Sequence, residues 1–591
     1  MKPSRLIYDL RKEKRVSQAD LARGLISLAD LSRFENGEKE LSYPTIEAMV
    51  QRLGKSCDKF EIQLNTQEYN ILFLRQQMLH NLRGKQELFD RLCEAYEELD
   101  ETEHSLHEQY LWMMKGCAAY LMHFDTKEAT KLLLFALEAT FPEWNTSSWM
   151  PFLLSTQEIQ IALLLAYCAL ENNQAEFAEN LLEHLSEKIT KDVTDEEEYA
   201  RLYPQWCYLK TEQMIRQNDI NSVRYYIKEG KKCISENGLL TLAVEFLDYE
   251  MRYGEEPETA KRERDAFFCA AELAGVLQEE DTFMQFILIN QHRELLLVNE
   301  LIRDTRQHKK ISQEELSWEV CAAETLSRIE SGKRKPHRRS CLKLYEKLGL
   351  NEVSYQVMET DDFTLLEMDR SLSGLISMGE YTEAEKVFQK IREKLDQSVF
   401  VNRQYIEHIQ ILLNVENGTL SYPDAILRLG EIISQSMNSS GNVIYRTPSR
   451  NEFSILAQIG MYHIHLKQFE KAKDIFEGLL AQYQKSKVTE EHHAREYMVI
   501  YIDISIALYS MKLYGEGTGY LLRGIHLAFQ TRRGDLLAIM LRNYAAGIIN
   551  RKTDSRENGI LMANASYWLF TFFGFEKMAL QTKEAFRLDN V

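Results

Sequence analysis

Hydrophobic and polar positions recur along most of the chain with the period of an amphipathic helix, and the helices come in pairs. Each pair consists of an apolar helix, a short polar turn and a second helix that opens with a charged and a small residue. The clearest pairs span residues 161–185, 365–391, 453–483 and 501–529. Ala384, Ala472 and Gly517 stand where the two helices of a pair would cross. Because a pair cannot bury its apolar face alone, the pattern predicts stacked helical repeats.

Composition favours helices throughout the chain. Only 9 prolines and 26 glycines interrupt 591 residues, too few for the turns of a β-sandwich, a propeller or a dinucleotide-binding sheet. Leu, Glu, Lys, Gln and Ala dominate most windows, and these residues favour helix. We therefore expect an all-α fold.

A gap-free internal match relates the two halves of the chain. Residues 6–37 align with residues 301–332 at an offset of 295. The identical pairs include Arg11 and Arg306, Ser17 and Ser312, Gln18 and Gln313, Arg33 and Arg328, and Glu35 and Glu330. Repeat starts follow near residues 69, 110, 157, 203 and 240, and again near 364, 403, 452, 498 and 535. The sequence therefore predicts a tandem duplication that extends through the repeats.

Each matching segment has the spacing of a helix-turn-helix. Ser17 is placed to cap a helix that begins at Gln18, and a second amphipathic helix runs from about residue 27 to residue 34. Residues 1–55 hold 11 basic and 8 acidic side chains, and residues 296–350 hold 12 and 8, in a chain of net charge −19. Two basic islands on an acidic body indicate that these two segments approach nucleic acid.

The strings SQADLA…LSRFENG and SQEELS…LSRIESGKRKP resemble the Cro/repressor-type (Xre) helix-turn-helix family. Fifteen residues separate Leu21 from Glu35 inclusively, a short turn similar to the Rgg/PlcR-type branch of the RRNPP regulators. That resemblance implies a helix-turn-helix followed by about five tetratricopeptide-like repeats, a short peptide bound on their concave surface, and a homodimer. It also implies salt bridges from Arg11 to Glu35 and from Arg306 to Glu330 that lock the first helix against the recognition helix.

The resemblance also places residues at DNA. The expected set is Ser27, Leu28, Ala29, Asp30 and Arg33 in the first copy, Ala322, Ala323, Glu324, Thr325 and Arg328 in the second, Gln18 and Gln313 on the DNA backbone, and Lys333, Arg334 and Lys335 on phosphates. Leu28 suits a thymine methyl group, and the two arginines suit guanine or phosphate. Asp30 and Glu324 either accept from a cytosine amino group or are solvated. Glu38 and Glu40 follow the first recognition helix instead of a basic run, so we expect the second copy to bind DNA more strongly.

We expect four domains and a regulatory function. The domains are a helix-turn-helix at 1–60, repeats at 66–295, a second helix-turn-helix at 296–355, and repeats with C-terminal capping helices at 361–591. The expected function is a cytoplasmic, sequence-specific transcription regulator that binds double-stranded DNA as a fused pseudo-dimer. The alternative is a repeat scaffold that binds protein partners and has weak or vestigial DNA binding. The sequence leaves further homodimerisation of the fused chain open.

A short peptide effector is expected in the repeat groove. The candidate residues are Asn402, Asn451, Arg495, Tyr501, Asp503, Arg542 and Asn543, because family members hold a peptide backbone with asparagines on inner helices. Ordinary polar residues on a solvated groove are an equally good interpretation of each. The first half offers fewer candidates, so the two halves need not share a ligand.

Enzymatic, metal and membrane functions find no support in the sequence. GEGTG at 515–519 follows a helix and lacks a phosphate-loop lysine, so we interpret it as a repeat turn. His492 and His493 lack the spacing of a zinc site and are expected to be solvated. The nine cysteines show no metal spacing and are expected to be buried free thiols. We expect no cofactor, no metal and no membrane span.

Overall fold

The computed structural model describes residues 3–57, 62–99, 104–141, 152–276, 281–287, 295–350, 357–360, 362–437, 444–551 and 556–588. These residues form an all-α protein, as predicted, with one pair of three-residue strands among them. None of the helices within these ranges combines the length and the apolar character required to span a bilayer. The predicted domain boundaries at residues 60, 355, 361 and 591 lie outside the described residues.

Two helix-turn-helix domains have matching helices. The first comprises α1 (Pro3–Glu13), α2 (Gln18–Ala22), α3 (Leu28–Glu35) and α4 (Tyr43–Arg52), and the second comprises α16 (Val298–His308), α17 (Gln313–Ser317), α18 (Ala323–Glu330) and α19 (Arg338–Leu348). The first residues of all four matching helices are related by the offset of 295 found in the sequence. Ser17 and Ser312 cap α2 and α17 by accepting from backbone amides at 3.0 Å, which confirms the predicted caps.

The remaining helices form two arrays of antiparallel hairpins. The first array contains α5 (Thr66–His80), α6 (Gln86–Glu97), α7 (His104–His123), α8 (Thr126–Thr140), α9 (Thr156–Glu171), α10 (Ala175–Glu187), the π-helix η1 (Lys188–Asp192), α11 (Glu196–Arg216), α12 (Ile220–Glu236), α13 (Ala243–Tyr253), α14 (Pro257–Ala274) and α15 (Thr282–Gln285). The second array contains α20 (Phe363–Met378), α21 (Tyr381–Lys394), α22 (Phe400–Glu416), α23 (Tyr422–Met437), α24 (Arg450–His465), α25 (Phe469–Lys485), the 3-10 helix η3 (Glu490–His493), α26 (Ala494–Ser510), α27 (Tyr514–Gln530), α28 (Leu537–Arg551), α29 (Arg556–Phe572) and α30 (Glu576–Phe586). From α9 and α24 onward, the first residues of several matching helices are related by an offset of 294, one fewer than in the helix-turn-helix domains.

Small residues allow the hairpins to close. Ala384 and Ala472 are fully buried, and a Cβ atom on Gly517 would collide with the ring of Tyr509, as expected where two helices cross. The interpretation of 515–519 as a turn is wrong, because these residues lie in the first turns of α27. The turn comes earlier, where Lys512 adopts a positive φ of 65°.

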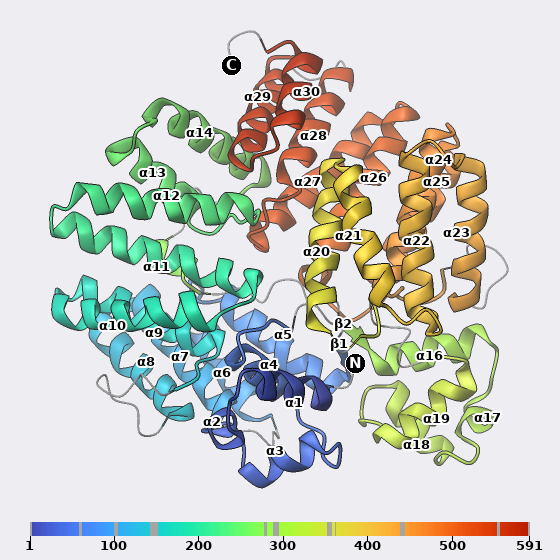
Figure 1. The fold of residues 1–591 in the computed structure, drawn as a ribbon, viewed down its shortest axis with the longest axis horizontal. Helices are drawn as coiled ribbons and strands as arrows, with labels where there is room; N and C mark the ends of the chain where they lie inside the picture. Colours follow the sequence, from blue (N-terminus) through green and yellow to red (C-terminus); the bar gives the residue numbers. More distant parts are fainter. Residues whose placement is uncertain are drawn as a thin grey trace.

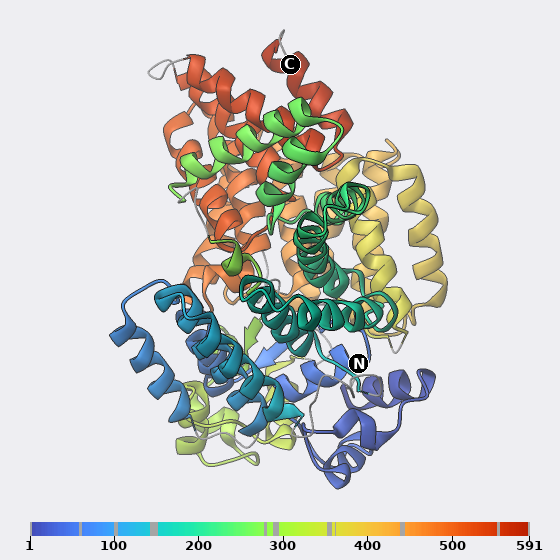
Figure 2. The same cartoon turned by 90° about the vertical axis from the view of Figure 1, so that its left-hand side faces the viewer.

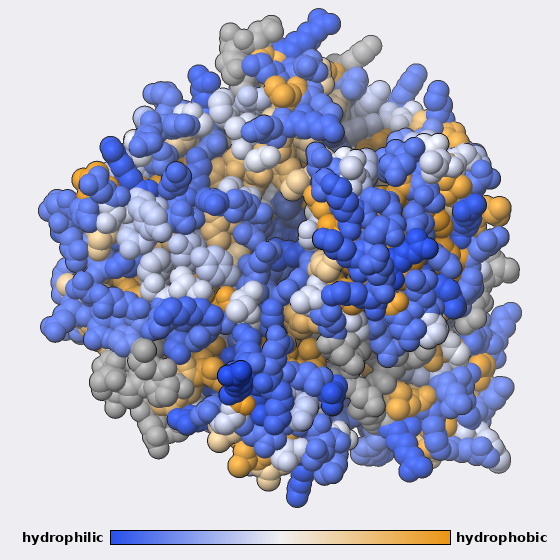
Figure 3. Space-filling view, in the orientation of Figure 1, coloured by the Kyte–Doolittle hydropathy of each residue, from blue (hydrophilic) through white to orange (hydrophobic). Residues whose placement is uncertain are grey.

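The two arrays lie side by side, with both helix-turn-helix domains along one edge (Figures 1 and 2). At the opposite end, α14 of the first array packs against α27 and α29 of the second. A single apolar core therefore runs from Ile71 in the first array to Ala579 in the second. The face shown in Figure 3 is mainly hydrophilic and is hollowed between the arrays.

The segment after the first helix-turn-helix domain and the segment before the second also join the two halves. Strand β1 (Ile62–Leu64) pairs in parallel with β2 (Leu295–Leu297), with Ile62 opposite Leu295. The sequence did not predict these strands, because a three-residue apolar run carries no recognisable period. Their pairing ties the chain after the first helix-turn-helix to the start of the second.

A pair of backbone hydrogen bonds relates the arrays by an approximate two-fold. The Leu240 amide donates to the Arg532 carbonyl at 3.0 Å, and the Gly534 amide donates to the Gly238 carbonyl at 2.7 Å. The offset of 294 relates Gly238 to Arg532 and also Leu240 to Gly534. Equivalent positions therefore meet each other, which is the property of an isologous interface.

The two helix-turn-helix domains dock on their arrays through different faces. In the first, Arg52 of α4 forms a fully buried ion pair with Glu158 of α9 at 2.6 Å. Lys347 occupies the position of Arg52 in the second domain. Both side chains donate to carbonyls of their own domain, but among the described residues Lys347 has no carboxylate partner. There α16 makes the docking contacts: Glu300 accepts from Ser486 at 2.7 Å, and His308 stacks on Tyr445 at 3.8 Å.

Docking of the first domain depends on Gly24. It has a positive φ of 69°, and a Cβ atom there would collide with the carbonyl of Thr140 in α8. We predict that Gly24→Ala lowers the melting temperature of the protein and exposes α4 to proteolysis. Gly37→Ala is the matched control, because Gly37 has a φ of 74° and nothing within 4 Å of an added Cβ. Both changes carry about 1 kcal/mol of backbone strain, so equal losses in the two variants would contradict the docking argument.

Candidate nucleic-acid interface

The same hydrogen-bond network fixes the recognition helix in both domains. Arg11 forms a bidentate pair with Glu35 at 2.6 and 2.7 Å, and its third nitrogen donates to the Val16 carbonyl at 3.0 Å. In the second domain, Arg306 pairs with Glu330 at 2.5 and 2.8 Å and donates to the Ile311 carbonyl at 2.9 Å. Both predicted salt bridges are therefore confirmed. The hydrogen bond from each arginine to its glutamate raises the arginine's pKa and so favours the charged guanidinium.

Gln18 and Gln313 belong to this network in the structure. Each side-chain amide donates to the glutamate of its own domain at 2.7 Å. The glutamate thus joins the first, second and third helices of the domain. Both glutamines are half-buried, so each keeps part of its surface at the N-terminus of the second helix.

The first recognition helix, α3, presents an exposed surface at its N-terminal end. Ser27, Ala29 and Arg33 are exposed, and the Leu28 side chain is 53% exposed, although leucine is normally buried. Ser27 also caps α3 by accepting from the Asp30 amide at 3.1 Å. Asp30 forms an ion pair with Lys39 at 2.8 Å, and this bond, with a second from Ser27, lowers the pKa of Asp30.

The second recognition helix, α18, presents a different surface. Ala322, Glu324 and Arg328 are exposed, whereas Ala323 and Thr325 are half-buried. Arg328 donates to Glu324 at 2.8 Å, four residues earlier in the helix. The N-cap position holds Ala322, which has no side-chain acceptor, where the first domain has Ser27. The two helices therefore differ in shape, charge and capping.

Two features flank α18 and have no equivalent in the first domain. Lys333, Arg334 and Lys335 are exposed directly after the helix, and Lys335 bonds to Glu68 of α5. Trp318, at the end of α17, is 70% exposed. Sequence reasoning missed Trp318, although an aromatic residue in a turn, where the first copy has Arg23, was a usable signal.

The predicted effector residues fall into two groups. Asn402 bonds to the backbone of Glu359 at 2.7 and 2.9 Å, and Asn451 donates to the Val357 carbonyl at 2.9 Å, so the chain's own linker occupies both amides. The second group, on α26 and α28, comprises Arg495, Tyr501, Asp503, Arg542 and Asn543. Burial raises the pKa of Asp503 to about 8 and lowers the pKa values of Arg495 and Arg542. The amide nitrogen of Asn543 is buried without a hydrogen-bond partner among the described residues.

The expectation for the paired histidines is wrong. His492 and His493 are 4% and 2% exposed, because η3 is held between the second array and the start of the first. Tyr69 packs edge-on against His492 with ring centroids 5.6 Å apart, and burial lowers the pKa of His493 to about 4. Within the described ranges, no group of three metal-ligating side chains is present. Six of the nine free cysteines are buried, and Cys269, Cys321 and Cys341 are partly exposed.

Comparison with known protein families identifies the first domain as a helix-turn-helix. A family model for helix-turn-helix domains matches residues 7–60. No curated protein matches the chain. Solved structures that align include PlcR of Bacillus thuringiensis in complex with the peptide PapR7 and DNA, at 16% identity over 49% of this chain and 99% of that one, with a TM-score of 0.34. ComR from S. thermophilus, in complex with DNA and its signalling peptide ComS, aligns at 14% identity over 49% of this chain and 100% of that one, with a TM-score of 0.31. The SHP pheromone receptor Rgg2 of Streptococcus dysgalactiae aligns at 16% identity over 49% and 98%, with a TM-score of 0.25.

Removing the Glu35 carboxylate tests whether the Arg11–Glu35 ion pair holds the recognition helix. We predict that Glu35→Gln destabilises the first helix-turn-helix domain by about 3 kcal/mol, because Arg11 is left as a buried charge without its partner. Hydrogen exchange of the α3 amides measures this loss locally. Glu38→Gln, at an exposed position three residues later, should leave the exchange unchanged. Similar protection in both variants would mean that the pair does not hold the helix.

Proposed function

We propose that the chain is a sequence-specific, DNA-binding transcription regulator that acts as a fused pseudo-dimer. The observation that carries the proposal is the presence of two exposed recognition helices, each fixed by the same Arg–Glu–Gln network, in one chain. Both domains lie along the same edge of the molecule (Figure 1), so one duplex is accessible to both. Two helix-turn-helix domains on one duplex read half-sites about one helical turn apart.

Tandem duplication of one unit is the proposed origin of this arrangement. The spacing of 294 or 295 residues between the first residues of many matching helices supports it, as do the reciprocal hydrogen bonds at Gly238–Leu240 and Arg532–Gly534. In this proposal the contacts between the arrays replace the subunit interface of a homodimer. Covalent linkage makes the second binding event intramolecular, so weak individual domains suffice.

The proposed base contacts follow from exposure. Arg33 and Leu28 in the first domain, and Arg328 in the second, reach bases or phosphates, and the two unlike surfaces favour an asymmetric site. Asp30 and Glu324 each hold a basic side chain at the surface, so we assign them a positioning role. Gln18 and Gln313, which also donate to Glu35 and Glu330, contact the DNA backbone.

We further propose that a short peptide bound to the arrays regulates DNA binding. The buried Asp503 carboxyl supports a polar ligand near α26 and α28, with Arg495, Tyr501 and Arg542 on the same helices. So does the Asn543 amide, which has no hydrogen-bond partner among the described residues. Such a ligand acts only through different affinities for arrangements that do or do not align the recognition helices.

Selection from a random DNA pool tests the proposed specificity. We predict an enriched site with two unlike halves about 10 base pairs apart. Arg33→Ala blurs one half and Arg328→Ala the other, each with an affinity loss of about 5- to 100-fold at its own half. Failure to enrich any sequence at low salt, together with a stoichiometric complex with a protein partner, would favour the scaffold function instead.

Salt dependence tests the basic run after α18. We predict that Lys333→Ala with Arg334→Ala reduces the slope of log affinity against log salt by about 2, because each phosphate contact contributes about 0.9. The affinity loss should be the same for all DNA sequences, since phosphate contacts carry no base information. The control is Lys131→Ala with Lys386→Ala in the two arrays, where both exposed side chains pair with acids on their own helices. Equal slopes for the wild-type protein and the Lys333/Arg334 variant would exclude these residues from the interface.

A further inference from the structure

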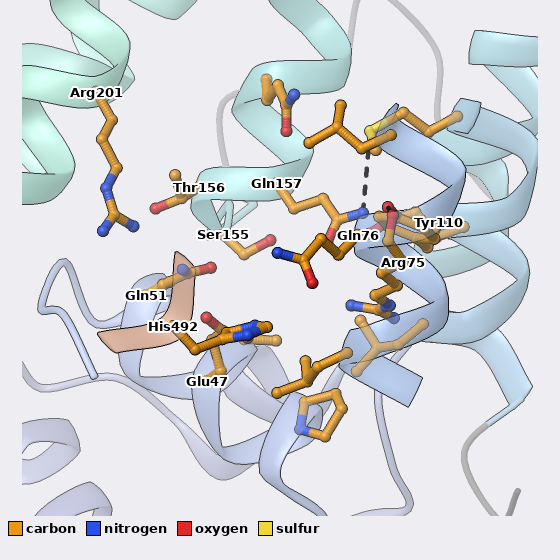
Figure 4. Close-up of a pocket in the computed structure, with 18 of the residues that line it drawn as sticks. Glu47, Gln51, Arg75, Gln76, Tyr110, Ser155, Thr156, Gln157, Arg201 and His492 are labelled. Atoms are coloured by element: carbon orange, nitrogen blue, oxygen red, sulfur yellow. Dashed lines mark hydrogen bonds between the residues drawn. The ribbon is translucent and has the colours of Figure 1, made fainter. Parts of the chain in front are cut away.

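A polar pocket lies where the first helix-turn-helix domain, the first array and the second half meet. It is lined by α4, α5, α7, α9 and α11 and by Glu491 and His492 of η3, and its cavity volume is about 80 Å³. Figure 4 shows Gln51 and Thr156 on one side and Arg75 and Tyr110 on the other, with Gln76 and Gln157 between them. We call this space the junction pocket.

Arg75 is a buried cation on the wall of this pocket. It is 6% exposed, its Nε donates to the Tyr96 hydroxyl at 2.9 Å, and its guanidinium lies 4.2 Å from the ring centroid of Tyr110. Among the described residues, no carboxylate lies within ion-pair distance of Arg75, and its two terminal nitrogens have no hydrogen-bond acceptor. A buried charge normally has a counter-charge, because the desolvation cost is otherwise uncompensated.

The second half shows how the same position is neutralised. The offset of 294 places Asp369 at the position of Arg75, and the buried residues of α5 and α20 match throughout in this register. Asp369 is also buried, but Arg450 lies 3.7 Å away and the Tyr405 hydroxyl donates to it at 2.7 Å. Thr156 holds the position of Arg450 in the first half and uses its hydroxyl to bond Glu198 at 2.6 Å. The first half therefore has a buried cation, Arg75, where the second half has a buried anion, and Thr156 supplies no opposite charge to it.

The second half also shows why the pocket is open. There the linker residues Val357 and Glu359 lie on Asn451 and Asn402. The corresponding linker of the first half forms β1, which pairs with β2, and among the described residues no side chain of α7 or α9 hydrogen-bonds to it. Gln157 replaces Asn451, and its side-chain amide lies 3.9 Å from the sulfur of Met113. Among the described residues, the first linker therefore does not occupy the place equivalent to Asn451, and the junction pocket lies there.

The unmatched polar atoms define the chemistry of a ligand. Arg75 offers hydrogen-bond donors with a positive charge, and the buried Oε1 of Gln109 is an acceptor without a partner among the described residues. We propose that the junction pocket binds a carboxylate that has an N–H group beside it, as in an amino acid derivative or the C-terminal residue of a peptide. The carboxylate pairs with the terminal nitrogens of Arg75, and the N–H donates to Gln109.

Occupancy of this site bears on both halves of the molecule. Glu47 and Gln51 of α4 come from the first helix-turn-helix domain, and Glu491 of the second half bonds to Gln76 and to His80 at 3.3 Å. A ligand that contacts all three parts changes the docking of the first domain, and by linkage the docking changes the ligand's affinity. The effect on DNA rests on the proposed function, whereas the binding itself does not.

Thermal shift with defined pools tests the site in the full-length protein. The probes are a random hexapeptide pool with free C-terminal carboxylates, the same pool with C-terminal amides, and a mixture of the twenty N-acetyl amino acids. We predict that a free-acid probe raises the melting temperature and the amidated pool does not. A shift with the hexapeptides alone identifies a peptide C-terminus, and a shift with the small acids alone identifies a free metabolite of that class.

Two variants and one control locate the ligand. Arg75→Gln and Gln157→Glu should each weaken binding by roughly tenfold to a hundredfold, the first by removing the cation and the second by placing a carboxylate in the pocket. Gln157→Glu preserves the contacts of Arg75 with Tyr96 and Tyr110, so it carries the test if Arg75→Gln fails to fold. Arg450→Gln removes a comparable arginine from the second half and should leave ligand binding unchanged.

Several results would overturn this proposal: no shift with any pool, equal shifts with acids and amides, or full affinity in both pocket variants. DNA binding, measured separately by gel mobility, distinguishes the two proposals. Ligand binding without any DNA binding would support the pocket proposal and contradict the proposed function. DNA binding without ligand binding would contradict only the pocket proposal.

Discussion

Each helical array ends in an apolar face that must be covered, and the whole arrangement depends on this constraint. A hairpin repeat must be covered by a neighbour, and the last repeat of an array has none of its own. Here α14 of the first array lies against α27 and α29 of the second, so each array covers the end of the other. The resulting core is continuous from Ile71 to Ala579. Closure at this end, together with the β1–β2 pairing near the other, brings both helix-turn-helix domains to one edge (Figures 1 and 2).

Buried glutamates then decide how each helix-turn-helix domain sits on its array. Glu158 and Glu452 occupy the same position, as the third residue of a capping box, and both need a cation because both are buried. Glu158 takes Arg52 from the helix-turn-helix domain, whereas Glu452 takes Arg446 from the segment directly before its own helix. Satisfying the glutamate locally frees the second domain from that contact. It docks instead through Glu300 and His308 on α16.

Local patterns account for the parts that could be predicted from the sequence. Helix periodicity, the Ser17 and Ser312 caps and the Arg11–Glu35 lock depend on residues within about one domain of each other, and all are present. The effector groove was less accessible to such reasoning. Asn402 and Asn451 were predicted as ligand-binding side chains, but a linker well before them in the chain occupies them. His492 is buried by Tyr69, from the other half of the chain, so no local pattern indicated its burial.

On the proposed duplication, covalent fusion of the two units explains why equivalent positions differ in this protein. In a homodimer with an isologous interface, one residue type must serve both sides of the axis. In a fused chain the two sides can differ, and they do: Arg532 donates to the carbonyls of Met284 and Ile287, whereas its counterpart Gly238 has no side chain to donate. The same freedom allows Asp369 to have its own arginine while Arg75 has no carboxylate beside it among the described residues. On the proposed duplication, one half therefore uses its linker to fill its groove, and the other half is free to use the same place for a ligand.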